Sequence, residues 1–128
     1  VFRMAEGDLV NLVPAVGEVN GDRSNYPFSA WSRQPEPVYG QCRTVVDFGM
    51  KRVQPREEVR GRVARIQFYM HERYGLRMSA QDRQLFCAWS REYPVDEWET
   101  ERNRRIEAIQ GSGNGFVTDP AKLAAVCG

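Results

Sequence analysis

The chain has 128 residues, of which 41% are hydrophobic and 27% are charged, and its formal net charge is +1. This length and composition can supply one ordinary hydrophobic core, so we expect one domain or a piece of one. The near-neutral charge argues against a uniformly basic nucleic-acid binder, and no apolar run approaches the roughly 18 residues that a membrane-spanning helix needs.

Residues 1–55 are dense in Gly, Pro, Asn and Asp, which favour turns and interrupt helices. Two short strands are expected within this part, at residues 11–16 and 44–48, because both stretches are short, apolar and rich in β-branched side chains. Three prolines fall within residues 26–40, which predicts a long surface loop between the two strands.

After Pro55 the apolar residues follow a helical period. A first helix is expected over residues 56–74, ended by Gly75, and its apolar residues predict a single buried stripe. The stripe consists of Val59, Val63, Ile66 and Met70. The fold class that follows is α+β, dominated by helices, with residues 1–128 as one domain whose second part is residues 56–128.

Two more helices and a short tail are expected after Gly75. Ser79 and Asp82 resemble a capping box at the start of the second helix. A third helix over about residues 95–110 should end at Gly111, and residues 123–126 could form a last helical turn. The side chains expected to face inward are Leu85, Phe86 and Trp89 in the second helix, with Trp98, Ile106 and Ile109 in the third, and Phe68 and Tyr69 join this aromatic core.

The three cysteines, Cys42, Cys87 and Cys127, are widely and irregularly spaced and predict no zinc site. In an oxidising compartment an odd number leaves one thiol free or bonded to something outside the chain. Three buried, unpaired thiols are the alternative.

Residues 17–25 form a polar, turn-rich segment directly after the first expected strand. Asn20, Asp22 and Arg23 lie within it. Asn and Asp oxygens at the start of a helix suit a hard cation such as Mg²⁺, although clusters of Asn, Gly, Asp and Ser are more often simple turns. The segment alone leaves both interpretations open.

Residues 8–25 read Asp-Leu-Val-Asn-Leu-Val-Pro-Ala-Val-Gly-Glu-Val-Asn-Gly-Asp-Arg-Ser-Asn, and this run is similar to a signature of the endonuclease I family. The similarity is ungapped over these residues and continues along the chain until it fades near residues 110–111. Further matching segments are residues 39–42, 46–48, 60–65, 68–70, 73–76, 84–86, 88–89, 94–95, 97–99 and 101–102.

The resemblance implies an α+β nuclease domain with a ββα-metal (His-Me) finger, which cuts DNA and, as a second substrate, RNA with little regard to sequence. Asn20 would be a metal ligand for Mg²⁺ or another divalent cation. The general-base histidine and a metal-binding glutamate would lie on a strand upstream of this chain, which begins at Val1 and is therefore expected to be a processed product or a fragment. No catalytic residue is expected in this chain, whose one histidine, His71, fits a solvated helix position.

The implied reaction is a one-metal hydrolysis, in which the histidine activates water and the cation stabilises the leaving oxygen. Sequence indifference would follow from contacts to phosphates rather than to base edges. Arg23, Arg62 and Arg65 are the candidates for those contacts. Packing is an equally good explanation for Arg23, and a solvated face is the commoner role for the arginines of the helix.

The resemblance also implies a periplasmic or secreted protein, with DNA as its partner and no membrane contact, assembled with an N-terminal segment of the same protein. Thr100 replaces a cysteine that in relatives would pair with the cysteine matching Cys42, which weakens the inference of an oxidising location. Two alternatives stay open. The missing histidine, Val10 and Gly113 suggest a non-catalytic nucleic-acid-binding derivative, and reduced cysteine dependence would suit an antibacterial effector nuclease neutralised by an immunity protein.

Overall fold

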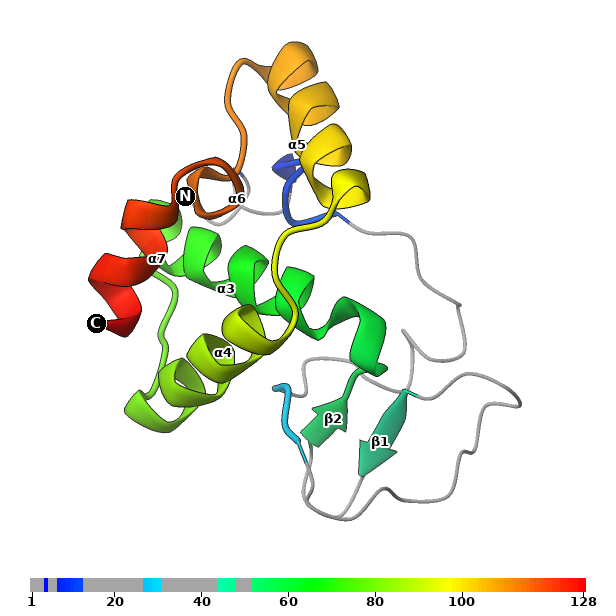
Figure 1. Ribbon diagram of the computed structural model, residues 1–128, viewed down its shortest axis with the longest axis vertical. Coiled ribbons are helices and arrows are strands. Elements are labelled where there is room, and N and C mark those ends of the chain that lie inside the picture. Colours follow the sequence, from blue (N-terminus) through cyan, green and yellow to red (C-terminus); the bar gives the residue numbers. More distant parts are fainter. Residues whose placement is uncertain (1–3, 5–6, 13–26, 31–43, 48–51) are drawn as a thin grey trace. The chain divides into compact units, whose positions relative to one another are not determined.

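The computed structural model describes residues 4, 7–12, 27–30, 44–47 and 52–128 (Figure 1). It divides the chain into two compact units. One unit is Pro14–Arg60, and the other joins Val1–Val13 to Gly61–Gly128. The described part is dominated by helices and contains a small sheet, which is compatible with the expected α+β class.

In the unit Pro14–Arg60, β1 (Val45–Asp47) and β2 (Arg52–Gln54) pair in antiparallel fashion, with Val46 opposite Val53. Strand β1 lies within the second strand expected from the sequence. Strand β2 was not predicted, because three residues with two long polar side chains show no apolar run.

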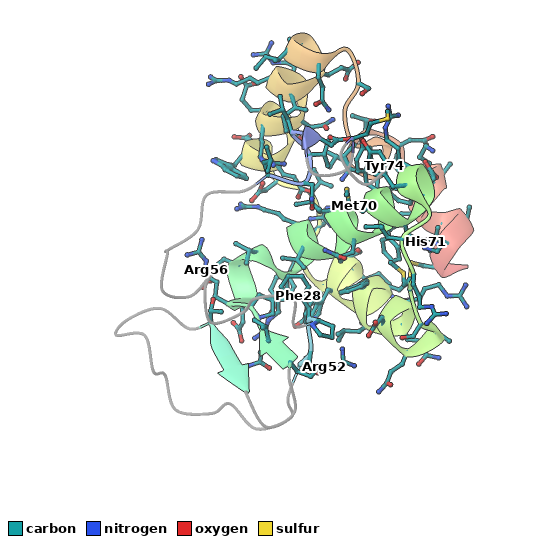
Figure 2. All side chains as sticks on the ribbon, turned by 180° about the vertical axis from the view of Figure 1, so that it is seen from behind. Phe28, Arg52, Arg56, Met70, His71 and Tyr74 are labelled. Carbon is teal, nitrogen blue, oxygen red and sulfur yellow. A yellow bond between two sulfur atoms is a disulfide. The ribbon has the colours of Figure 1, made fainter. Side chains whose placement is uncertain are left out.

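The surface loop predicted for residues 26–40 is described only at residues 27–30, which are exposed or half-buried and irregular except for an isolated parallel bridge between Phe28 and Val53. The Ser29 amide donates to the carbonyl oxygen of Val53 at 2.7 Å, and the Val53 amide donates to that of Pro27 at 2.9 Å. Figure 2 shows Phe28 close to Arg52, whose guanidinium donates to the Phe28 carbonyl at 3.3 Å.

The short 3₁₀ helix η1 (Glu57–Val59) leads into α3 (Arg60–Tyr74), so the first helix is confirmed to within a few residues and stops before Gly75, which has φ 68°. Its buried face agrees with the prediction only in part: Met70 of the stripe is buried, as are Phe68 and Tyr69, which were expected in the core. Val63 and Ile66 are only half-buried, and the buried residues are Gly61, Ala64, Arg65, Phe68, Tyr69 and Met70. The periodicity of the apolar residues could not predict that an arginine would be buried on this face.

Helix α4 (Ala80–Glu92) begins as the sequence predicts, with the Ser79 hydroxyl accepting a hydrogen bond from the Asp82 amide at 3.0 Å. Phe86 and Trp89 are buried as expected. The ring of Phe86 meets that of Phe68 on α3 edge-to-face, with centroids 6.1 Å apart, and this contact joins the two helices.

Helix α5 (Glu97–Gln110) is capped by the Asp96 carboxylate, which accepts from the Glu99 amide at 2.8 Å, and Gly111 ends it with φ 83°. Both ends agree with the prediction. The predicted inward face differs from the structure. Of its three residues only Ile106 is buried, whereas Trp98 is 54% exposed and Ile109 is 76% exposed.

The tail forms α6 (Gly115–Thr118) and α7 (Pro120–Cys127), so more of it is helical than residues 123–126. Helix α7 packs against α4 and α6. A disulfide joins Cys87 on α4 to Cys127 on α7, with Cα atoms 5.6 Å apart. This bond excludes three unpaired thiols and any Cys42–Cys87 pairing, and Cys42 lies outside the described residues.

Candidate functional site

The proposed metal ligand Asn20 and the proposed phosphate contact Arg23 lie outside the described residues, so their roles stay predictions. Within the ranges that the structure describes, no group of three or more His, Cys, Asp or Glu side chains could hold a metal ion. His71 is exposed on α3, and its Nδ1 lies 2.5 Å from the carbonyl oxygen of Leu76, as expected for a solvated helix position.

Arg65 was a candidate for phosphate contact, and its environment points to a different role. Its side chain is buried, and Nε and Nη2 each bond a carboxylate oxygen of Glu99 at 2.7 Å. Nη2 also donates to the carbonyl oxygen of Tyr93 at 3.0 Å. Gly61 lies beside this oxygen, and a Cβ at residue 61 would clash with it. A guanidinium enclosed in this way has no surface to offer a nucleic acid, so Arg65 is a structural residue that locks α3 to α5.

Arg62, the other helix candidate, is partly exposed. Its Nη2 bonds the Asp96 carboxylate at 2.7 Å, and its guanidinium carbon lies 4.3 Å from the ring centroid of Trp98. The pKa of Asp96 is lowered by the hydrogen bond from the Glu99 amide and by the bond from Arg62. Contact between Arg62 and phosphate stays a prediction.

The structure shows a second polar cluster at Asp8, the first residue of the motif segment. The Asp8 carboxylate is buried and accepts hydrogen bonds from the hydroxyls of Tyr69 and Tyr74, each at 2.5 Å, and from Gln110 at 3.0 Å. Its own side chain also accepts from the Val10 amide at 3.0 Å, which closes a turn. Figure 2 labels Tyr74 on the last turn of α3, beside Met70 and His71.

The electrostatics of this cluster favour a charged Asp8. Burial disfavours the carboxylate, but the hydrogen bonds from the two tyrosines, Gln110 and Val10 outweigh it, so the pKa of Asp8 is lowered. Burial and the hydrogen bond to Asp8 raise the pKa of Tyr69, and the same two causes raise that of Tyr74. Both tyrosines are therefore neutral donors at physiological pH.

Arg102 on α5 holds the residues that follow Asp8. Its Nη2 lies 3.1, 3.2 and 2.7 Å from the carbonyl oxygens of Leu9, Val10 and Leu12. The Leu9 amide in turn donates to the side-chain oxygen of Gln110 at 3.1 Å. Residues 8–12 are thus tied to α3 and α5 by side chains from both helices.

This attachment replaces the beginning of the first expected strand. The amides of Asn11 and Leu12 donate to the carbonyl oxygens of Asp8 and Leu9 at 3.0 and 3.2 Å, so the strand prediction is wrong at these two residues. The rest of that strand, residues 13–16, lies outside the described part. The chain is held at Leu12, eight residues before Asn20.

Sequence reasoning missed the residues that build this attachment. Asp8, Tyr69, Tyr74 and Arg102 all lie in the segments that match the family signature, and Gln110 lies where the match fades. Their polar character within these segments was the one sign of a role in the structure. The spacing of the sequence does not relate Asp8 to tyrosines more than 60 positions away.

Replacing Asp8 with Asn should lower the free energy of unfolding by about 2 kcal/mol at neutral pH, because two tyrosine hydroxyls lose a charged acceptor. Since the folded-state pKa is lowered, the stability that the Asp8 charge contributes is present above the unfolded-state pKa of about 4 and is lost as the pH falls through the lower folded-state value. Urea unfolding at pH 7 and pH 3 measures both effects. The control Glu107→Gln removes an exposed carboxylate on α5 and should change neither the stability at pH 7 nor the stability lost at pH 3. If Asp8→Asn lost as much stability between pH 7 and pH 3 as the wild type does, the stabilising role of the Asp8 charge would be contradicted.

Known proteins match this chain over a region that includes Asp8 and Gln110. The profile of the Endonuclease I family matches residues 3–121. A periplasmic deoxyribonuclease of Aeromonas hydrophila is 56% identical over 117 residues, which are 91% of this chain and 49% of that protein. An extracellular deoxyribonuclease of the same species is 53% identical over 91% of this chain and 50% of its own length.

A third relative, endonuclease-1 of Buchnera aphidicola, is 41% identical over 91% of this chain and 46% of its own length. The chain therefore spans about half the length of the curated relatives that it matches. The residues that attach the motif segment, from Asp8 to Gln110, lie inside the region matched by the family. This chain belongs to the endonuclease I family.

Proposed function

We propose that the intact protein is an endonuclease that hydrolyses phosphodiester bonds of DNA, with RNA as a second substrate, and that it has little sequence preference. The observation that carries this proposal is the family match over residues 3–121, supported by relatives that are named deoxyribonucleases. Because the chain spans about half of those relatives, the activity is proposed for the whole protein.

The proposed reaction depends on a divalent cation, Mg²⁺, which would polarise the phosphate and stabilise the leaving oxygen when bound. Asn20 is the ligand proposed from this chain. The described residues offer no metal-binding cluster and no histidine other than the exposed His71. Their proposed contribution is to hold residues 8–12 in place through Asp8 and Arg102, while Arg62 and Arg23 are the proposed contacts to phosphate.

We place the intact protein in the periplasm or outside the cell. Two relatives are named periplasmic and extracellular, and disulfides such as Cys87–Cys127 form and persist in oxidising compartments. The alternative of an effector nuclease neutralised by an immunity protein stays a prediction.

The intact protein should convert supercoiled plasmid to nicked circles in the presence of Mg²⁺, and EDTA should stop the reaction. Asn20→Ala should lower both the nicking rate and the calorimetric affinity for Mg²⁺, because a small polar ligand is lost, while the circular dichroism spectrum and thermal midpoint stay unchanged. An unchanged rate and affinity would remove Asn20 from the site. Absence of nicking by the wild-type protein would refute the proposed function itself.

The 128-residue chain by itself is expected to bind nucleic acid weakly, in a salt-dependent way, and to show no cleavage above background. General-base catalysis is typically worth roughly 10²–10⁴-fold, and the general-base histidine is proposed to lie outside this chain. Plasmid incubated with the purified chain tests this. EDTA-sensitive nicking by the chain alone would contradict the proposal, and His71 would then be the first residue to replace.

A further inference from the structure

Three main-chain oxygens of the segment 8–12 converge on a single nitrogen of Arg102. The carbonyl oxygens of Leu9, Val10 and Leu12 lie 3.1, 3.2 and 2.7 Å from its Nη2. Figure 1 shows this segment running beside α5, the helix that carries Arg102. We call the three oxygens the carbonyl cradle. Carbonyl oxygens gathered around one point suit a cation, and the Arg102 guanidinium is the cation that they bind.

The cradle depends on this guanidinium. Val10 is fully buried, so water has little access to its carbonyl oxygen, and a buried carbonyl oxygen needs a donor from the protein. Arg102 itself is half-buried, and the carboxylate of Glu99, one turn earlier on α5, favours its charged form. Loss of the guanidinium would leave the segment 8–12 without its attachment to α5.

One turn of α5 holds the helical unit at both points where the chain joins it to the unit Pro14–Arg60. The first point follows directly after the carbonyl cradle, which Arg102 binds. The second is at Gly61 on α3, the helix that the Arg65–Glu99 pair locks to α5. Glu99 and Arg102 are three residues apart, which places them about 60° apart on the helix. The two attachments therefore lie side by side on α5.

We propose that Arg102 is a positioning residue for the metal ligand Asn20 and acts on it through the main chain. This proposal rests on the proposed function, which assigns Asn20 to the metal. Asn20 follows Leu12, the last residue of the cradle, by eight positions. Fixing the start of a short segment lowers the conformational entropy that its ligand loses on binding a cation, so the cation binds more tightly.

A direct contact between Arg102 and phosphate suits the geometry less well. Bidentate recognition of phosphate uses two nitrogens of the guanidinium fork, whereas the cradle surrounds one nitrogen. A lysine ammonium is a compact charge with three donors, which matches three carbonyl acceptors but cannot bind phosphate in the bidentate manner. Arg102→Lys should therefore preserve positioning, although it would not preserve a bidentate contact to phosphate.

Calorimetric titration of the intact protein with Mg²⁺ tests the proposal. Arg102→Ala should weaken Mg²⁺ binding about 10-fold, the lower end of the range for residues that support a metal ligand. Arg102→Lys should stay within about threefold of the wild type. Arg105→Ala is the matched control, because Arg105 lies on the same helix and bonds Glu101 at 2.9 Å, and it should leave the affinity unchanged.

Chemical rescue separates positioning from a general loss of stability. Guanidinium chloride at a millimolar, non-denaturing concentration should restore most of the Mg²⁺ affinity of Arg102→Ala, because the free cation can occupy the carbonyl cradle. Tetramethylammonium chloride at equal ionic strength donates no hydrogen bonds and should restore none. Hydrogen exchange gives a readout without metal: the amides of Asn11 and Leu12 should exchange faster in Arg102→Ala and slow again with guanidinium.

Circular dichroism verifies that each variant is folded at the temperature of the titration. Arg102→Met keeps the packing of the side-chain stem and replaces Arg102→Ala if that variant does not fold. Unchanged Mg²⁺ affinity in the folded variant, an equal loss in Arg105→Ala, or a loss that guanidinium does not reduce would overturn the proposal. In each of these cases a wild type that binds Mg²⁺ and nicks plasmid leaves the proposed function standing. A wild type that does neither would refute the proposed function and this inference with it.

Discussion

Arg65→Ala should lower the free energy of unfolding by about 3–5 kcal/mol, the range for breaking a buried ion pair by removing one partner. The substitution leaves the Glu99 carboxylate, which is 5% exposed, without its two bonds of 2.7 Å, and it deprives the Tyr93 carbonyl oxygen of a donor. Chemical denaturation at neutral pH measures the loss.

Arg62→Ala is the matched control, because Arg62 lies on the same helix and pairs with Asp96 at the same 2.7 Å, but with the Asp96 side chain 52% exposed. Solvent-exposed pairs are worth about 0–1 kcal/mol, so this loss should be small. The double variant Arg65→Met with Glu99→Leu should recover most of the stability, since it removes both charges together. Equal losses from Arg65→Ala and Arg62→Ala would contradict the buried role of Arg65.

Cys127→Ser should lower the free energy of unfolding by roughly 4 kcal/mol. The disulfide closes a loop over a sequence separation of 40 residues, and removing it restores that loop's entropy to the unfolded chain. Helix α7 buries none of its residues, so the disulfide to α4 is a large part of what attaches it. Thermal and urea unfolding under non-reducing conditions measure the change.

Two controls separate the covalent bond from the side chain. Ala125→Ser places the same hydroxyl on an exposed position of α7 and should cost less than about 0.5 kcal/mol. Adding a reductant should bring the wild-type protein close to the Cys127→Ser variant and leave the variant itself unchanged. A variant as stable as the oxidised wild type would show that the disulfide does not stabilise this unit.

The helical elements could be predicted from the sequence because their determinants are local. Ser79 with Asp82 predicted the start of α4, and Gly75 and Gly111 predicted where α3 and α5 end; all three agree with the structure. Capping and left-handed glycine conformations depend on neighbours within one turn, so no tertiary information is needed. The motif residues likewise indicated the family, and that prediction is confirmed.

Which faces of those helices are buried could be predicted only in part: Phe86 and Trp89 lie inside as expected, but other positions were decided by the tertiary structure. The period of α3 pointed to Val63 and Ile66, whereas the structure buries Arg65 because Glu99, 34 residues later, neutralises it. Trp98 and Ile109 were expected inside and lie exposed, because burial depends on which elements are present to cover a stripe.

The attachment of residues 8–12 and the pairing of the cysteines depended on the tertiary structure for the same reason. Asp8 meets Tyr69 and Tyr74 across more than 60 residues, and Cys87 meets Cys127 across 40. Spacing in sequence says nothing about such distances once the chain folds back on itself. Residue types and local order therefore predicted the family and the helices of this protein, while only the packing of α3, α4, α5 and α7 decided which polar side chains and cysteines meet.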